Sequence, residues 1–223
     1  LSGNNNYLNQ SNSSRRPTLI SNVVNGRKAV RFDGAGDKLV ANLGAGTLSE
    51  ITFFSVSNFR PATQPAGVNN SMYMLGNNKN TSVNFLRRNA NGGVDADKYY
   101  SRTEGINRIG ELVDNTVHIY SQRFESTAPY HYLNVDGDAQ TVDAHNSIIT
   151  VSSSLSYGSL SWTHKSSFDG DMCEFIIFEG MNRTQQIIVE NYLSAKYNLS
   201  LAAKSRTAPR VIPRREPASN GGV

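Results

Sequence analysis

Ile51-Thr-Phe-Phe-Ser-Val-Ser-Asn-Phe59 is the strongest β-strand candidate in the chain. Side chains alternate between the two faces of a strand, which places Phe54 and Val56 on one face and Ile51, Phe53 and Phe59 on the other. A strand with large apolar residues on both faces is buried on both faces. This stretch therefore predicts the centre of a sheet that is covered on both sides.

Short strand-like segments, separated by Gly, Asn and Asp, surround this central strand. The dipeptide Asp136-Gly137 favours a hairpin turn and predicts a return strand over residues 140–142. Residues 1–16 predict an irregular lead-in, and residues 89–105, with their Gly pair, predict an exposed loop. The other predicted strands are residues 28–32, 38–41, 71–75, 82–87, 116–124, 130–135, 148–151, 155–160 and 172–178.

One segment, residues 184–197, has the period of an amphipathic helix. Thr184 is the expected N-cap, and Asn198 is the expected stop. One helix beside many short strands predicts an all-β, two-sheet antiparallel sandwich closed by a C-terminal helix. The face expected to pack on the sheet carries Ile188, Val189, Tyr192, Leu193 and Lys196.

The net charge of +4 is confined to the C-terminal end of the chain. Five basic residues and one acid follow Ala202, and removing them from the totals of 22 and 18 leaves 17 of each sign. The body, residues 1–201, is therefore neutral, and we expect no nucleic-acid partner for it. Residues 202–223 are basic and rich in Pro and Arg, and this composition predicts an extended tail. We expect this tail to contact a neighbouring subunit through Arg206, Arg210, Arg214 and Arg215.

No apolar run approaches the roughly 20 residues that cross a bilayer, so we expect no membrane insertion. The chain begins at Leu1 rather than Met, and we expect either a processed product or a piece of a longer protein. The single cysteine, Cys173, lies in an apolar run and is expected to behave as a small buried hydrophobe.

Several short motifs, in a fixed order, resemble a known family. They are Ser2-Gly3-Asn4, Arg16-Pro17-Thr18, the run from Asn25 to Gly34, Phe168-Asp169-Gly170-Asp171 with Glu174, and the final Tyr192-Leu193-Ser194-Ala195-Lys196-Tyr197. Their order resembles the concanavalin A-like lectin/glucanase superfamily, and more closely the laminin-G-like domains of bacterial surface and secreted proteins. The resemblance spans roughly residues 2–199. It implies a jelly roll that serves carbohydrate binding, adhesion or assembly, at an extracellular, cell-surface or particle-surface location.

The resemblance also implies a structural calcium ion in some members. Calcium binds six to eight oxygen ligands, and two Gly-rich acidic turns offer Asp33, Asp169 and Asp171 as candidates. The alternative is that Asp33 and Asp169 cap their turns by accepting hydrogen bonds from backbone amides, as Asp-Gly sequences commonly do. Apart from this calcium ion, no cofactor is expected.

A flat aromatic ring on the surface is the usual platform for a sugar. The candidates for a ligand-binding platform are Tyr99, Tyr100, Tyr130 and Trp162, with Tyr157 as a further one. The alternative for several of them is packing in the core or across strands.

No catalytic residues are predicted. Retaining glycosidases need two carboxylates about 5 Å apart, and the Glu-x-Asp-x-Glu strand of the β-glucan hydrolases on this fold is missing here. The four histidines lack metal-ligand spacing, although His118 and His131 could meet across paired strands. The sequence therefore favours a non-catalytic carbohydrate-binding or adhesion module whose partner is a glycan or surface polysaccharide. The alternatives are a structural component of a virion or surface filament whose tail straps onto a neighbouring subunit and, third, a glycan hydrolase or lyase.

Overall fold

A computed structural model of the chain describes residues 8–48, 50–60, 71–77, 83–89, 98–103, 106–111, 115–126, 131–139, 151–158 and 167–202. For residues 42–48, 71–77, 83–89, 98–103, 106–111, 131 and 151–154 it describes the backbone and the strand pairing alone.

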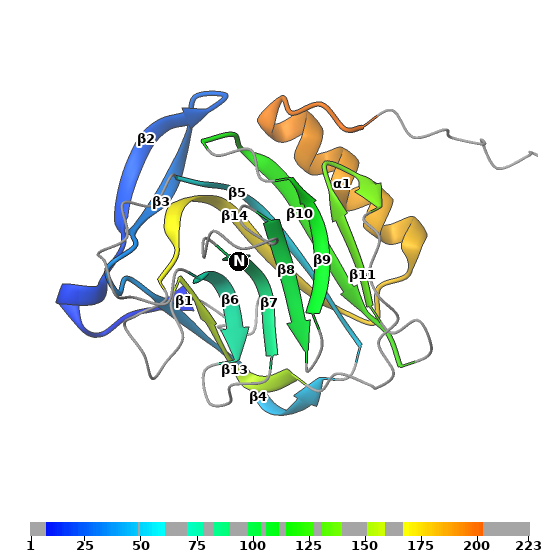
Figure 1. The fold of residues 1–223 in the computed structure, drawn as a ribbon, viewed down its shortest axis with the longest axis horizontal. Helices are drawn as coiled ribbons and strands as arrows, with labels where there is room; N and C mark the ends of the chain where they lie inside the picture. Colours follow the sequence, from blue (N-terminus) through cyan, green and yellow to red (C-terminus); the bar gives the residue numbers. More distant parts are fainter. Residues whose placement is uncertain are drawn as a thin grey trace, which may run out of the picture.

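Fourteen strands in these residues form two seven-stranded sheets, and every pairing within them is antiparallel (Figure 1). Sheet A has the order β1-β4-β13-β6-β7-β8-β9, and sheet B has the order β12-β11-β10-β5-β14-β3-β2. The predicted all-β, two-sheet antiparallel sandwich with one C-terminal helix is confirmed. The strands are β1 Leu8–Asn9, β2 Thr18–Val24, β3 Arg27–Asp33, β4 Leu39–Leu48, β5 Ile51–Phe59, β6 Ser71–Asn77, β7 Val83–Asn89, β8 Lys98–Thr103, β9 Ile106–Glu111, β10 His118–Phe124, β11 His131–Val135, β12 Asp138–Ala139, β13 Val151–Tyr157 and β14 Asp169–Glu179.

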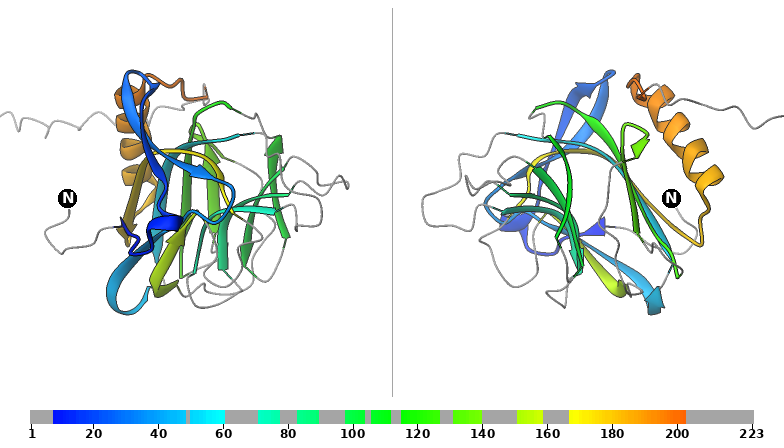
Figure 2. Two further views of the ribbon diagram at one scale, coloured as in Figure 1. Left: turned by 90° about the vertical axis from the view of Figure 1, so that its left-hand side faces the viewer. Right: turned by 45° about the vertical axis from the view of Figure 1, so that its right-hand side comes forward.

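Strand β5 occupies the centre of sheet B, between β10 and β14, and all nine of its residues are buried. On one face, Ile51, Phe53 and Phe59 join the core between the sheets. On the other face, Phe54 and Val56 pack beneath the C-terminal helix α1. Figure 2 shows α1 (orange) on the outer side of the sandwich. The alternation of apolar residues along β5 therefore predicts both layers that cover sheet B.

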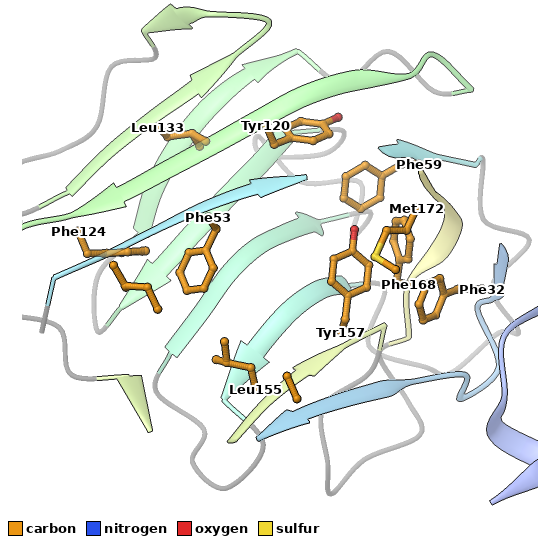
Figure 3. Close-up of a cluster of buried hydrophobic side chains, with 12 residues drawn as sticks. Phe32, Phe53, Phe59, Tyr120, Phe124, Leu133, Leu155, Tyr157, Phe168 and Met172 are labelled. Carbon is orange, nitrogen blue, oxygen red and sulfur yellow. The ribbon is translucent and has the colours of Figure 1, made fainter. Parts of the chain in front are cut away.

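The core between the sheets is aromatic at the end of β5 where the chain leaves the strand (Figure 3). The ring of Phe168 lies edge-on to Phe59 at a centroid distance of 5.2 Å, and it lies 5.4 Å from Phe32. Tyr157, from sheet A, completes the cluster, and its hydroxyl bonds to Ser55 Oγ at 2.8 Å. Such ring pairs stabilise a core by about 0.5–1.5 kcal/mol each beyond their buried area. They fix strands β3, β5 and β14 relative to one another.

The helix α1, Arg183–Tyr197, begins earlier than its apolar pattern predicts. Asn182 is the N-cap: its side chain accepts a hydrogen bond from the backbone N–H of Gln185, and the Gln185 side chain accepts one from the N–H of Asn182. The prediction of Thr184 as N-cap is therefore wrong, because this reciprocal capping box already satisfies the first turn. The predicted stop is confirmed, since Asn198 adopts the left-handed conformation that ends the helix.

The face of α1 that packs on sheet B matches the prediction in part, since Leu193 is buried and Val189 packs against the same cluster. Ile188 and Tyr192 are 61% and 52% exposed. The predicted face was chosen for its apolar residues, whereas the observed one mixes apolar side chains with a buried polar network. The buried residues of the helix are Gln186, Glu190, Leu193 and Tyr197.

Two other predictions about local structure are corrected, and a third is tested only in part. The lead-in contains β1 and a short 3-10 helix, Ser13–Arg15. The predicted loop over residues 89–105 contains β8, which pairs with β7 and β9. The turn at Asp136-Gly137 is present, but the return strand is β12, immediately after the turn. Residues 140–142 lie outside the described residues. Strand β8 was not predicted because its sequence is mainly polar, whereas the pairing of a strand with its neighbours cannot be seen in the sequence.

Candidate functional site

A surface cleft of about 420 Å³ opens on the outer face of sheet B, where β5 ends. This volume lies within the range of small-molecule sites. Strand β2 bulges beside it: Ile20 pairs with Ala29 and Val24 with Arg27, so three residues of β2 stand opposite one residue of β3. The residues that line the cleft are Ile20, Ser21, Asn22, Val23, Arg31, Asn58, Arg60, Asn115, Val117 and Asp171.

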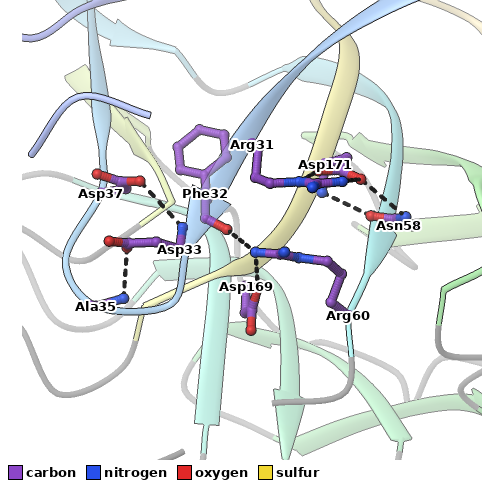
Figure 4. A network of polar contacts seen from close by, with 9 residues as sticks. All are labelled: Arg31, Phe32, Asp33, Ala35, Asp37, Asn58, Arg60, Asp169 and Asp171. Carbon is purple, nitrogen blue, oxygen red and sulfur yellow. Dashed lines mark hydrogen bonds and ion pairs between the residues drawn. The ribbon is translucent and has the colours of Figure 1, made fainter. Parts of the chain in front are cut away.

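Asp171 lies at the polar centre of this cleft. It belongs to β14, which lies between β3 and β5. The strand register places it opposite Arg31 on one side and Asn58 on the other. Arg31 binds it through two parallel hydrogen bonds, Nε to Oδ1 at 2.7 Å and Nη2 to Oδ2 at 2.9 Å. Asn58 Oδ1 accepts a hydrogen bond from the Asp171 backbone N–H at 2.7 Å (Figure 4). A forked pair of this kind fixes both side chains in one geometry.

In the ion pair between Arg31 and Asp171, the carboxylate is buried and the guanidinium is partly exposed to solvent. The Asp171 side chain is 3% exposed, whereas that of Arg31 is 40% exposed. Hydrogen bonding to Asp171 raises the pKa of Arg31. A guanidinium has five N–H donors, so the two hydrogen bonds to Asp171 leave three for other partners. Arg31 can therefore hold the buried carboxylate and still offer donors to the cleft.

Arg60 forms a second arginine–aspartate pair at the end of β5. Its Nη2 donates to the backbone oxygen of Phe32 at 2.9 Å and forms an ion pair with Asp169. Its backbone N–H also donates to Asp169 O at 2.9 Å. Burial raises the pKa of Asp169 even though Arg60 opposes the shift. Both the main chain and the side chain of Arg60 are thus held in place.

Gly170 lies between Asp169 and Asp171 and allows β14 to approach β5 closely. A side chain at this position would meet the backbone oxygen of Asn58 and the ring of Phe168. Only a residue without Cβ fits there. Gly170 is therefore part of what places Asp169 and Asp171 beside their arginines.

The three calcium candidates are brought close together, but two of them are held by arginine. Asp169 stands opposite Asp33 in the register of β3 and β14. Asp33 Oδ1 accepts a hydrogen bond from the backbone N–H of Ala35 at 2.8 Å, which is the turn-capping role. Across the described ranges, no group of three or more His, Cys, Asp or Glu residues is arranged to hold a metal ion. The donor set fits ion pairs with arginine better than a calcium ion, and calcium binding stays a prediction.

Asp37 is a buried acid in the same turn. It is 7% exposed, and its Oδ2 accepts a hydrogen bond from the Asp33 backbone N–H at 3.2 Å. Burial and the negative charge of Asp33 raise its pKa to about 6. Neither Asp33 nor Asp37 lines the cleft.

The aromatic candidates lie in different parts of the chain. Tyr99 and Tyr100 are adjacent in β8, next to the edge strand β9 of sheet A, and their backbones pair with β7 and β9. Tyr130 and Trp162 lie outside the described residues, as do Arg206, Arg210, Arg214 and Arg215 of the tail. Tyr157 is fully buried in the core, so its prediction as a sugar platform is wrong.

His118 and His131 do not meet across the paired strands. His118 stands opposite Ser57, and His131 stands opposite Phe124 at the other end of β10. His118 Nδ1 instead lies 2.5 Å from Asp136 Oδ2 in the hairpin turn. Turn geometry decides this contact, because the Asp136 backbone is left-handed, with φ of 49°.

A second polar network lies buried between α1 and sheet B. Glu190 is 2% exposed, and its Oε1 accepts hydrogen bonds from Ser121 Oγ, Asn134 Nδ2 and Gln186 Nε2 at 2.5, 2.5 and 3.2 Å. Gln186 Nε2 also donates to Ser121 Oγ at 2.8 Å. These contacts anchor the helix, and they explain why its buried face is polar in part.

Sequence reasoning missed Arg31, Asn58 and Arg60 as site residues. Arg31 and Asp171 are 140 residues apart in the chain. One signal was present: Arg31 lies between Val30 and Phe32, Asp171 directly precedes the apolar run that begins at Met172, and the two have opposite charges. Since a buried charge requires a partner, the two could have been matched.

No protein-family model matches this sequence, and no curated protein matches it at a significant level. Solved structures do match its fold. The binding domain of Paraclostridial Mosquitocidal Protein 1 is similar with a TM-score of 0.63 at 13% identity, covering 86% of this chain and 49% of that one. Domain 4 of AbnA, an extracellular arabinanase of Geobacillus stearothermophilus in complex with arabinotriose, gives 0.50 at 13% identity and covers 75% of this chain and 79% of that domain.

The sialidase of Trypanosoma rangeli is also similar, with a TM-score of 0.55 at 10% identity over 78% of this chain. This chain spans 28% of the sialidase and about half of the toxin domain. At such identities the likeness shows the β-sandwich fold alone. No helix in the described part of the chain is both long and apolar enough to cross a membrane.

Proposed function

We propose that this chain is a non-catalytic carbohydrate-binding or adhesion module, of the laminin-G-like kind, from a surface or secreted protein. The observation that carries the proposal is the shared sandwich fold. It is common to a toxin's binding domain and to an arabinanase domain whose structure contains arabinotriose. The sequence resemblance independently leads to the same class.

The arrangement of carboxylates supports a binding function rather than hydrolysis. Among the described residues that line the cleft, Asp171 is the one carboxylate, and Arg31 holds both of its oxygens. Asp169 is paired with Arg60. Most glycosidases need two carboxylates that face their substrate, one to donate a proton and one to act as a base or nucleophile.

A glycan array probed with the full chain tests the proposal. We expect binding to a defined set of glycans. If an aromatic platform holds the glycan, Trp162→Ala or Tyr99→Ala weakens binding about tenfold, because ring stacking supplies part of the affinity. Tyr192→Ala is the matched control, since Tyr192 is an exposed aromatic on α1. An array without any bound glycan would contradict the proposal. Release of reducing ends from the bound glycans would favour the hydrolase alternative instead.

A further inference from the structure

The cleft on the outer face of sheet B has the chemistry of a polyol site. Several of its polar side chains are flat and can form hydrogen bonds in pairs: the guanidinium group of Arg31 and the amides of Asn22 and Asn115. Such groups can bridge two neighbouring hydroxyls of a sugar ring. Ile20, Val23 and Val117 add apolar surface, which suits the C–H face of the same ring.

The charges of the cleft are already balanced. Arg31 is neutralised by Asp171 and Arg60 by Asp169, and both aspartates are held largely inside the protein. An anionic ligand would therefore have to compete with carboxylates that the fold holds in place. An uncharged ligand can instead use the N–H groups of Arg31 that do not bind Asp171, without breaking either pair.

The cleft is also organised before any ligand arrives. Asn58 is fixed by its hydrogen bond with the Asp171 backbone, and Arg60 is fixed by Phe32 and Asp169. Asn22 and Asn115 line the cleft with left-handed backbones, at φ of 59° and 63°. Groups held in position in advance lose little conformational freedom on binding, which favours affinity.

We propose that this cleft binds an uncharged sugar residue of the glycan, with Arg31, Asn22 and Asn115 as contact residues. The inference rests on the proposed carbohydrate-binding function and adds the site and the ligand class. It differs from the aromatic platform of the sequence prediction, whose candidates do not line the cleft among the described residues.

Asn22→Gly and Asn115→Gly give a direct test. Glycine adopts a left-handed backbone more readily than asparagine, so each change removes an amide from the cleft and leaves the turn intact. Asn25→Gly is the matched control, because Asn25 is also left-handed, at φ of 47°, and does not line the cleft. Thermal unfolding of each variant verifies that it folds.

The probes are the neutral glycans and the uronic- and sialic-acid glycans of a printed array, followed by isothermal titration with the strongest binder. We expect that binder to be neutral. Its affinity should change less than about twofold between low and high salt, because no net charge is screened. Each cleft variant should weaken binding about fivefold or more, and Asn25→Gly should not weaken it.

The possible outcomes separate this inference from the proposed function. If a neutral glycan binds both cleft variants as tightly as the unchanged chain, the cleft is the wrong site and the carbohydrate-binding function stands. If the strongest binders are acidic and salt weakens them steeply, the ligand class is wrong. If the unchanged chain binds no glycan, the proposed function and this inference both fail.

Discussion

Individual charged residues in this sandwich work in pairs that the strand register creates. Arg31 and Asp171 meet because β14 lies beside β3, and Asn58 joins them from β5. Asp33 and Asp169, which the sequence groups as members of two acidic turns, do stand opposite each other. The pairing of Arg60 with Asp169 could not be predicted, because a shift of one residue in register would turn each side chain to the other face.

Asp37 gives a prediction about pH at the residue scale. Its pKa of about 6 lies above the ordinary value for an aspartate, about 3.9. The charged form is therefore disfavoured in the folded state. This destabilisation grows as the pH rises from about 4 and is complete above about 6. Asp37→Asn removes the charge but keeps an oxygen that can accept the Asp33 N–H.

We expect Asp37→Asn to raise the melting temperature at pH 7.5 and to leave it nearly unchanged at pH 4. The measurement is thermal unfolding across this pH range in EDTA, which removes any bound calcium. A difference between the two proteins that stays constant with pH would show that Asp37 does not carry the effect.

The bounds of an element agree with the sequence prediction where burial of apolar residues determines them. They differ from the prediction where strand pairing or helix capping determines them. Strand β5 matches its predicted bounds because its apolar residues face two buried layers. Strand β8 was missed because its sequence, KYYSRT, is polar. The face of α1 was predicted only in part: Leu193 is buried as expected, but Gln186 and Glu190 are also buried while Ile188 is exposed. The spacing of apolar residues does not predict buried polar residues that form hydrogen bonds with one another.

The capping box of α1 predicts unequal effects at two neighbouring positions. Asn182→Ala should destabilise the protein by about 1 kcal/mol, because it removes the N-cap. Thr184→Ala should change stability by less than about 0.5 kcal/mol, because Thr184 lies inside the first turn. Urea unfolding of both variants measures the difference. Equal losses would place the start of the helix elsewhere.

Substitution of Glu190 in the same helix is expected to lower stability more than substitution of the N-cap. Glu190→Ala leaves the Ser121, Asn134 and Gln186 donors buried without their shared acceptor. We expect it to lower the free energy of unfolding by about 3 kcal/mol or more. Ile188→Ala, at a site 61% exposed, is the control and should stay within about 0.5 kcal/mol. A larger loss at Ile188 than at Glu190 would mean that the apolar face packs on the sheet.

At the scale of the whole molecule, the net charge is divided unevenly: the sandwich is neutral and the C-terminal segment is basic. The last described residues are attached to the body: Ala202 N donates to Asp136 O at 2.8 Å, and Leu201 packs over Gly137. The remainder of the chain therefore starts from a fixed point beside the β11–β12 hairpin. Whether it binds a neighbouring subunit is a prediction from its charge.

Light scattering on the full chain and on a chain that ends at Ala202 tests this assembly prediction. We expect the full chain to form larger particles than the shortened one at low salt and the difference to shrink at high salt, since arginine contacts with acidic surfaces are screened. Equal masses under both conditions would remove the assembly alternative and leave the glycan as the partner.

The most direct measurement of the central claim is a crystal structure of the full chain grown with the strongest glycan from the array. The account predicts an intact, uncharged glycan on the protein, with a sugar residue in the cleft next to Arg31 and Asn115. A cleaved glycan would contradict the non-catalytic function. A protein that crystallises at saturating glycan with none bound would contradict the carbohydrate-binding function itself.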